Sequence, residues 1–212
     1  NLHNNKITKI YEKSFADLKN LRKLSLNANK IAEIPENAFN ELKNLQEIYL
    51  NDNLLETIPS TLFHFNLDLR VFHIEMNQLK KLPMTIFHGL KSLNEAKIDY
   101  NEIEALPNRL FMNNKELKVL TISHNKLTLI GEENFVVFEH LQEHNFLDNP
   151  CTEDLERVYD VDELKSVVNE NCQANWEVKH NWLYDEISEM ALKRGKRSLG
   201  NLDDSKAQII EE

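Results

Sequence analysis

Several acidic and histidine side chains in the middle of this chain have the types and the spacing that a catalytic or metal site could use. Glu75 and Asp99 are 24 residues apart, and two carboxylates held about 5 Å apart form the catalytic pair of a retaining glycosidase. Together with Asp52 they could instead offer oxygen ligands to a calcium ion. His73 and His124 carry the ring nitrogens that zinc sites use. Whether these side chains meet depends on the elements that hold them.

A repeat of 24 residues runs through the chain and contains all of these positions. Three columns of the repeat each hold one kind of residue, in one common register. They are the asparagines Asn5, Asn29, Asn53, Asn77, Asn101, Asn125 and Asn149, the phenylalanines Phe15, Phe39, Phe63, Phe87, Phe111 and Phe135, and the aliphatic residues Ile10, Ile34, Ile58, Leu82, Leu106 and Ile130. The repeat is LxxLxLxxNxLxxLPxxxFxxLxx, and such agreement between columns does not arise by chance.

Each copy of the repeat predicts a short strand and a return segment. The fourth and sixth positions, such as Leu24 and Leu26, alternate with polar residues as in a strand with one buried face. The Asn side chain offers two donors and an acceptor to backbone groups that lose their partners where the chain turns. The proline in four copies keeps the preceding residue extended, and the Phe column fills the far side of the core. Because one 24-residue unit cannot bury its own apolar face, the copies must stack into a solenoid.

The solenoid argues against catalysis at the acidic and histidine positions. Glu75 and Asp99 fall in the same column of neighbouring strands, about 5 Å apart, but an open parallel sheet has no cleft to desolvate them. His73 and His124 lie two strands apart, about 10 Å, which is too far to share one zinc ion. We therefore predict that the protein is not an enzyme and uses no metal or cofactor.

These motifs resemble the leucine-rich repeat, in the 24-residue form typical of extracellular animal proteins such as Toll-type receptor ectodomains and insect secreted immune proteins. The resemblance covers Asn1 to about Pro150. It implies an α/β repeat solenoid, a leucine-rich-repeat horseshoe with short parallel strands on the concave face. We expect four parts: a solenoid of six to seven repeats at 1–149, a C-terminal cap at 150–172, an amphipathic helix at 173–197 and a flexible tail at 198–212.

The first residue falls inside a repeat, with Leu2 already at an inward position. We expect the chain to be part of a longer protein. Leu2, Ile7 and Ile10 should then be partly exposed, whereas their equivalents Leu26, Ile31 and Ile34 should be buried.

Cys151 and Cys172 are the only cysteines, and both follow the last repeat. A pair of free buried thiols, as in a cytosolic protein, is one interpretation. The resemblance favours the other, a disulfide that closes the cap around two short helical patterns at about Glu153–Tyr159 and Asp162–Val168. A single bridge is similar to the caps of insect secreted leucine-rich-repeat proteins, and it indicates secretion.

The segment after the cap has a heptad pattern. Trp176, Leu183 and Met190 are spaced by seven, with His180 and Ile187 between them, which predicts an amphipathic helix. This helix could fold back on the last repeat, or it could form a homo- or heterodimer as in mosquito immune relatives.

A basic stretch ends that helix. Arg194, Lys196, Arg197 and Ser198 resemble a furin-type cleavage site, although basic residues also stabilise a helix C-terminus.

Charge and surface composition point to a protein partner. The net charge of −10 argues against binding to nucleic acid or an anionic membrane, and no apolar run approaches the roughly 20 residues of a membrane span. Aromatic and charged residues gather at concave positions of the middle repeats, as in a protein-binding hot spot. They are Tyr49, Val71, His73, Glu75, Met76, Lys97, Asp99 and Tyr100.

We therefore predict a secreted recognition or scaffold module, of innate-immunity type, that binds a protein through its concave face or its C-terminal helix. The alternatives are an extracellular structural spacer and an enzyme inhibitor. A solvated concave face without a ligand is the competing interpretation of the surface.

Overall fold

A computed structural model of the protein describes residues 1–152 and 161–172. The chain divides into two units, Asn1–Ala174 and Asn175–Glu212, and all described residues belong to the first. The predicted helical pattern at Glu153–Tyr159, the amphipathic helix and the tail therefore lie outside the described residues.

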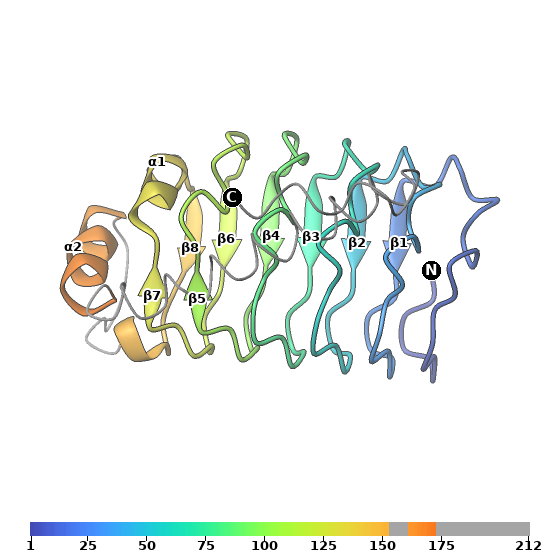
Figure 1. Cartoon of the computed structure of the whole chain (residues 1–212), viewed down its shortest axis with the longest axis horizontal. Helices are drawn as coiled ribbons and strands as arrows, with labels where there is room; N and C mark the ends of the chain where they lie inside the picture. Colours follow the sequence, from blue (N-terminus) through green and yellow to red (C-terminus); the bar gives the residue numbers. More distant parts are fainter. Residues whose placement is uncertain (153–160, 173–212) are drawn as a thin grey trace, which may run out of the picture. The chain divides into compact units, whose positions relative to one another are not determined.

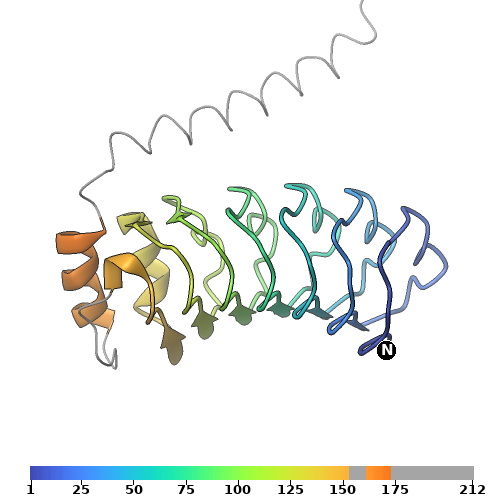
Figure 2. The same cartoon turned by 90° about the horizontal axis from the view of Figure 1, so that it is seen from below.

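Six strands of three residues form one parallel sheet in the order β1-β2-β3-β4-β6-β8 (Figure 1). Their bounds are β1 Lys23–Ser25, β2 Glu47–Tyr49, β3 Val71–His73, β4 Glu95–Lys97, β6 Val119–Thr121 and β8 Glu143–Asn145. Each residue pairs with the one 24 positions later, as Leu24 does with Ile48. Figure 2 shows the strands along the inner edge of a curved solenoid, so the predicted concave sheet is confirmed.

The convex side is mostly turns, with few regular elements. A second parallel pair joins β5 (Ala105–Leu106) to β7 (Leu129–Ile130). The 3-10 turn η1 (Glu132–Asn134) leads into the short helix α1 (Phe135–Phe138). The chain then returns through β8 to the 3-10 turn η2 (Pro150–Thr152) and the cap helix α2 (Val161–Asn171).

The inward positions predicted from the repeat are all buried. They are Leu24, Leu26, Ile48, Leu50, Phe72, Ile74, Ala96, Ile98, Leu120 and Ile122. Phe72 lies opposite the small Ala96, and its ring contacts both Phe63 and Phe87 of the convex column, with centroids 5.4 and 5.6 Å apart. One large strand residue thus links the two sides of the core, and the small neighbour leaves room for it.

The Asn column satisfies the turns of neighbouring repeats as predicted. Asn77 donates through Nδ2 to the carbonyl of Leu50 in the preceding repeat (3.1 Å) and to that of Ile74 in its own (3.0 Å). Its Oδ1 accepts from the N–H of Leu55 (3.0 Å). The same pattern recurs at Asn53, Asn101 and Asn125.

Two further buried asparagines, outside the predicted Asn column, were not predicted. Asn66 and Asn114 replace, in two repeats, the leucine found at Leu42 and Leu90, and both are fully buried. Asn66 donates to the carbonyl of Leu42 at 2.8 Å, and Asn114 to that of Leu90 at 2.7 Å. These amides cross-link the convex turns of neighbouring repeats.

The first repeat agrees only in part with the prediction. Leu2 is 39% exposed and Ile7 is half-buried, whereas Leu26, Ile31 and Ile34 are buried. The prediction for Ile10 is wrong, since it is 3% exposed. Ile10 belongs to the same apolar cluster as Phe15 and Ile34, so packing against the following repeat is enough to bury it.

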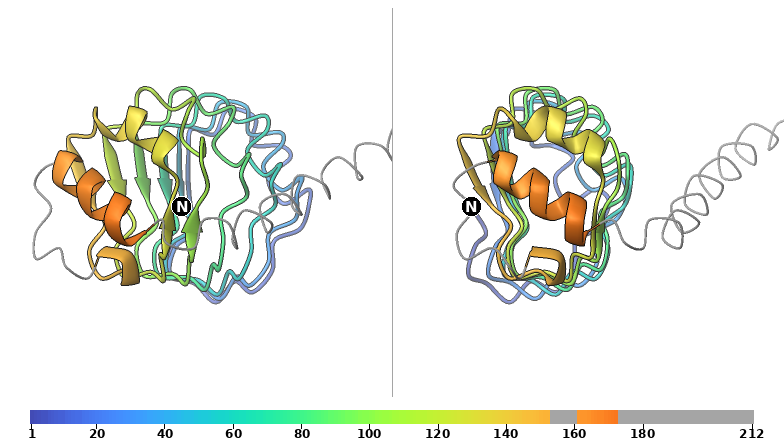
Figure 3. Two further views of the ribbon diagram at one scale, coloured as in Figure 1. Left: turned by 60° about the vertical axis from the view of Figure 1, so that its left-hand side comes forward. Right: turned by 90° about the vertical axis from the view of Figure 1, so that its left-hand side faces the viewer.

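The cap closes the C-terminal end of the solenoid. Cys151 and Cys172 form the predicted disulfide, and the predicted helix at Asp162–Val168 is part of α2. Figure 3 shows α2 lying across the end of the repeats, where Leu164 and Val168 are fully buried. Among the described residues, no helix is both long and apolar enough to cross a bilayer.

Candidate protein-interaction surface

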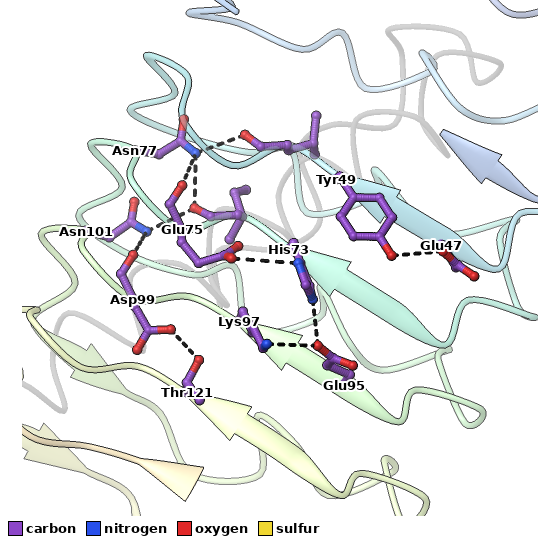
Figure 4. A network of polar contacts seen from close by, with 12 residues as sticks. Glu47, Tyr49, His73, Glu75, Asn77, Glu95, Lys97, Asp99, Asn101 and Thr121 are labelled. Carbon is purple, nitrogen blue, oxygen red and sulfur yellow. Dashed lines mark hydrogen bonds and ion pairs between the residues drawn. The ribbon is translucent and has the colours of Figure 1, made fainter. Parts of the chain in front are cut away.

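Side chains of neighbouring strands form a network of polar, aromatic and electrostatic contacts on the concave face, and Figure 4 shows its polar contacts. The network comprises Glu47, Tyr49, His73, Glu75, Glu95, Lys97 and Asp99. It extends over β2, β3 and β4 and the turns that follow β3 and β4. We call these residues the concave network.

Tyr49 is held by charged neighbours at one end of the network. Its hydroxyl donates to Glu47 at 2.8 Å, and the ammonium of Lys23 lies 2.7 Å from the same carboxylate and 4.5 Å from the centre of the Tyr49 ring. Hydrogen bonds from Lys23 and then from Tyr49 lower the pKa of Glu47. Burial, and then the bond to Glu47, raises the pKa of the Tyr49 hydroxyl. Tyr49 is therefore fixed before any partner arrives.

His73 connects Tyr49 to the next strand. Its ring meets that of Tyr49 edge-on at 4.9 Å, and its Nε2 lies 2.8 Å from Glu95 Oε1. Lys97 lies 3.3 Å from the same oxygen. Burial alone would raise the pKa of Glu95, but the hydrogen bonds from His73 and Lys97 outweigh burial and hold that pKa below its usual value.

Glu75 is the least satisfied member of the network. Its Oε1 lies 3.7 Å from His73 Nδ1, beyond hydrogen-bond distance. Its Oε2 is buried and has no hydrogen-bond partner among the described residues. Burial raises the pKa of Glu75, the Glu75 backbone N–H and His73 oppose that rise, and the neighbouring Asp99 carboxylate adds to it.

Asp99 is occupied by the following repeat. Its Oδ2 accepts from the Thr121 hydroxyl, and its Oδ1 accepts from the Ser123 N–H at 2.8 Å and the Ser123 hydroxyl at 2.7 Å. These bonds fix Asp99 as a structural link between repeats. They also distinguish it from Glu75, with which it shares a column.

Two large apolar side chains stand exposed beside the network. Met76 is 55% and Tyr100 is 49% exposed. Both occupy the eighth column, which has left-handed backbone in every described repeat, with φ of 56° and 55° at these two residues. Tyr100 stacks on His124 at 4.2 Å, and His124 lies 3.2 Å from Asp148. We call Met76 and Tyr100 the exposed pair.

The structure brings most of the predicted site residues together. Tyr49, His73, Glu75, Lys97 and Asp99 belong to the concave network, and Val71 lies half-buried on β3 beside it. Tyr49 and His73 face each other, whereas His73 and His124 belong to separate contacts. Among the described residues, no group of three His, Cys, Asp or Glu side chains could hold a metal ion.

Sequence reasoning missed Glu47 and Glu95, which join the network from the third column. Val71 is the one predicted site residue in that column, and it lies on β3 between the strands that carry Glu47 and Glu95. Reading the third column beside the fifth, where Tyr49, His73 and Lys97 lie, would have revealed alternating charges on adjacent strands.

The remaining predicted sites lie outside the described residues. They are the helix interface at Trp176, Leu183, Ile187 and Met190, and the cleavage motif at Arg194, Lys196, Arg197 and Ser198.

The fold and the surface together define a class: a capped solenoid of short repeats that presents its strand side chains on one open concave face. Profiles described as "Leucine rich repeat" match residues 1–55, 19–70, 43–101, 67–127 and 97–143. The chain therefore belongs to the leucine-rich repeat family, whose domains typically mediate protein–protein interaction.

A solved structure gives a more particular likeness. The crystal structure of the leucine-rich repeat domain of APL1B matches with 27% identity and a TM-score of 0.58. The match covers 64% of this chain and 40% of that one, so the chain spans less than half the length of that domain. The comparison with curated proteins found no match.

Proposed function

We propose that the protein is a secreted, non-catalytic recognition module that binds a protein partner through the concave network and the exposed pair. The observation that carries this proposal is the exposure of Met76 and Tyr100 next to side chains that are already fixed. Tyr100, already stacked on His124, supplies aromatic contact area at low entropic cost, as in binding hot spots, and Met76 adds adaptable apolar surface. Tyr49, which is locked by Glu47 and Lys23, serves to support the frame.

Secretion is supported by the cap. A disulfide persists in oxidising compartments and is rare in the cytosol, and Cys151 and Cys172 are paired. The innate-immunity assignment rests on the likeness to APL1B, an insect immune protein. A non-catalytic role is supported by the open sheet, which offers no cleft, and by Asp99, whose two carboxylate oxygens already accept hydrogen bonds from the next repeat.

The test is a capture experiment with matched variants. The protein is immobilised as wild type, as Met76→Ala/Tyr100→Ala and as the control Phe65→Ala/Met112→Ala. The control residues are 47% and 46% exposed and belong to the convex turns. We expect a partner from native extracellular fluid to bind wild type and control but not the concave variant.

Equal capture by all three proteins would overturn the concave assignment. If no partner is captured by any of them, the structural spacer becomes the better account. Capture that survives in the concave variant but fails after removal of residues 175–212 would place the site on the predicted C-terminal helix, including its dimer interface.

A further inference from the structure

The concave face carries a large excess of negative charge. From β1 to β8, the positions in the third, fifth, seventh and eighth columns hold seven carboxylates and two ammonium groups. The acids are Glu47, Asp52, Glu75, Glu95, Asp99, Glu143 and Asp148, the cations are Lys23 and Lys97, and the histidines are His73 and His124. With neutral histidines, this face accounts for −5 of the chain's net charge of −10.

Both cations of this face are already used internally. Lys23 pairs with Glu47 at 2.7 Å and Lys97 with Glu95 at 3.3 Å. Among the described residues, no lysine or arginine forms an ion pair with the other five carboxylates. A partner that buries this face must therefore supply positive charge, because uncompensated carboxylates are costly to desolvate.

Glu75 is the carboxylate at which that need is greatest. Its Oε2 is buried without a hydrogen-bond partner, and its side chain keeps 19% of its surface exposed. Asp99, its neighbour in the same column, has donors from Thr121 and Ser123 instead. Met76 follows Glu75 in the chain and Tyr100 follows Asp99, and both are exposed. Their apolar and aromatic surfaces suit the stem and head of a long cationic side chain.

We propose that the partner presents a lysine- or arginine-rich segment to the concave face, and that Glu75 anchors one of its cationic side chains between Met76 and Tyr100. This inference rests on the proposed function, because it names the chemistry of the partner at the same surface. The Glu75 side chain has no lysine or arginine partner among the described residues, and the partner's cation compensates its charge at the part of the side chain that stays exposed.

The probe is a synthetic peptide of four Lys-Ala pairs, with four Glu-Ala pairs as its negative control. Eight extended residues span about 26 Å, and six neighbouring strands span about 24 Å. Calorimetry or fluorescence anisotropy gives Kd for wild type and for two matched pairs of variants. Glu75→Gln is compared with the convex Glu41→Gln, and Lys97→Gln with the convex Lys43→Gln.

We expect Glu75→Gln to weaken binding of the lysine peptide by about fivefold or more, and Lys97→Gln to tighten it by about twofold. The convex variants should change Kd by less than about 1.5-fold, since exposed single charges contribute little. Glu75→Asp, which keeps the charge, should retain most of the affinity. Circular dichroism confirms that each variant is folded, and the Lys97 pair tests the inference independently if Glu75→Gln unfolds.

Equal losses in Glu75→Gln and Glu41→Gln would overturn the inference, because attraction would then depend on net charge alone. Binding of the Glu-Ala peptide as tightly as the Lys-Ala peptide would also overturn it. If Glu75→Gln leaves the Kd of the lysine peptide unchanged while a captured partner still requires Met76 and Tyr100, this inference fails and the proposed function stands. If the captured partner also binds Met76→Ala/Tyr100→Ala as well as wild type, the proposed function fails.

Discussion

The Asn77→Ala substitution should lower the free energy of unfolding of the solenoid far more than the position of Asn77 near the surface suggests. Asn77 is 8% exposed, and its amide donates to the carbonyls of Leu50, Ile74 and Glu75 and accepts from the N–H of Leu55. All three carbonyls keep another partner, because Leu50 also accepts from Asn53, Ile74 from Asn101 and Glu75 from the N–H of Asp52. The N–H of Leu55 loses the bond to Asn77.

The magnitude follows from these losses. A buried donor without a partner costs about 1–3 kcal/mol. The three carbonyls share the two hydrogens of the Asn77 amide, and the loss of each hydrogen costs about 0.5–1.5 kcal/mol. Asn77→Ala should therefore lower the free energy of unfolding by about 2–6 kcal/mol. Urea denaturation followed by circular dichroism measures it.

Asn5→Ala is the matched control in the same column. Asn5 is exposed and donates to the carbonyls of Leu2 and His3 in an exposed turn, so its loss should cost less than about 1 kcal/mol. A cost below about 1 kcal/mol for Asn77→Ala, or equal costs at the two positions, would refute the role given to the Asn column.

Three further predictions concern the backbone, the charges and the cap. Ala28 has a φ of 54°, a left-handed backbone conformation that strains a β-branched residue. Ala28→Val should therefore destabilise the protein by about 1–3 kcal/mol, whereas Ala28→Gly should not destabilise it. Equal effects of the two variants in thermal unfolding would contradict this backbone strain. The folded protein lowers the pKa of Glu95, so the contribution of Glu95 to stability is present above the usual glutamate pKa of about 4.3 and is lost as the pH falls through the folded pKa. The folded protein raises the pKa of Glu75, so the contribution of Glu75 is present below the usual pKa and is lost as the pH rises through the raised, folded pKa. In urea denaturation at pH 7, Glu95→Gln should therefore be less stable than wild type and Glu75→Gln more stable. Both differences should shrink as the pH is lowered and the two carboxyl groups become protonated. Differences of one sign at pH 7 would show that the network is described wrongly. Reduction of the Cys151–Cys172 bridge, which spans 21 residues, should lower the free energy of unfolding by about 3 kcal/mol. An unchanged urea midpoint in the presence of dithiothreitol would show that the bridge does not stabilise the cap.

The repeat made the backbone of the solenoid predictable from sequence. Leu24, Asn77 and Phe39 each recur at one spacing, and stacking leaves such columns a single inward direction. Ile10 was predicted wrongly because burial at the first repeat depends on how far the following repeat covers it. Asn66 and Asn114 were missed because they break the leucine column, and only the structure shows which carbonyls their amides reach.

The candidate surface was predictable in position but not in its contacts. Column membership placed Tyr49, His73 and Lys97 on one face. Whether Tyr49 is free or locked depends on the rotamers of Glu47 and Lys23, which no spacing specifies. The different states of Glu75 and Asp99, which share a column, arise from Thr121 and Ser123 in the next repeat.

Oxidation of two methionines in one sample tests the concave assignment most directly. Met76 lies on the concave side and Met112 in a convex turn, and they are 55% and 46% exposed. Because methionine oxidation follows exposure, dilute hydrogen peroxide should modify both at similar rates in the free protein. The account predicts that a bound partner slows oxidation of Met76 by about tenfold or more and leaves Met112 unchanged. Protection of Met112 with Met76 still reactive would contradict it.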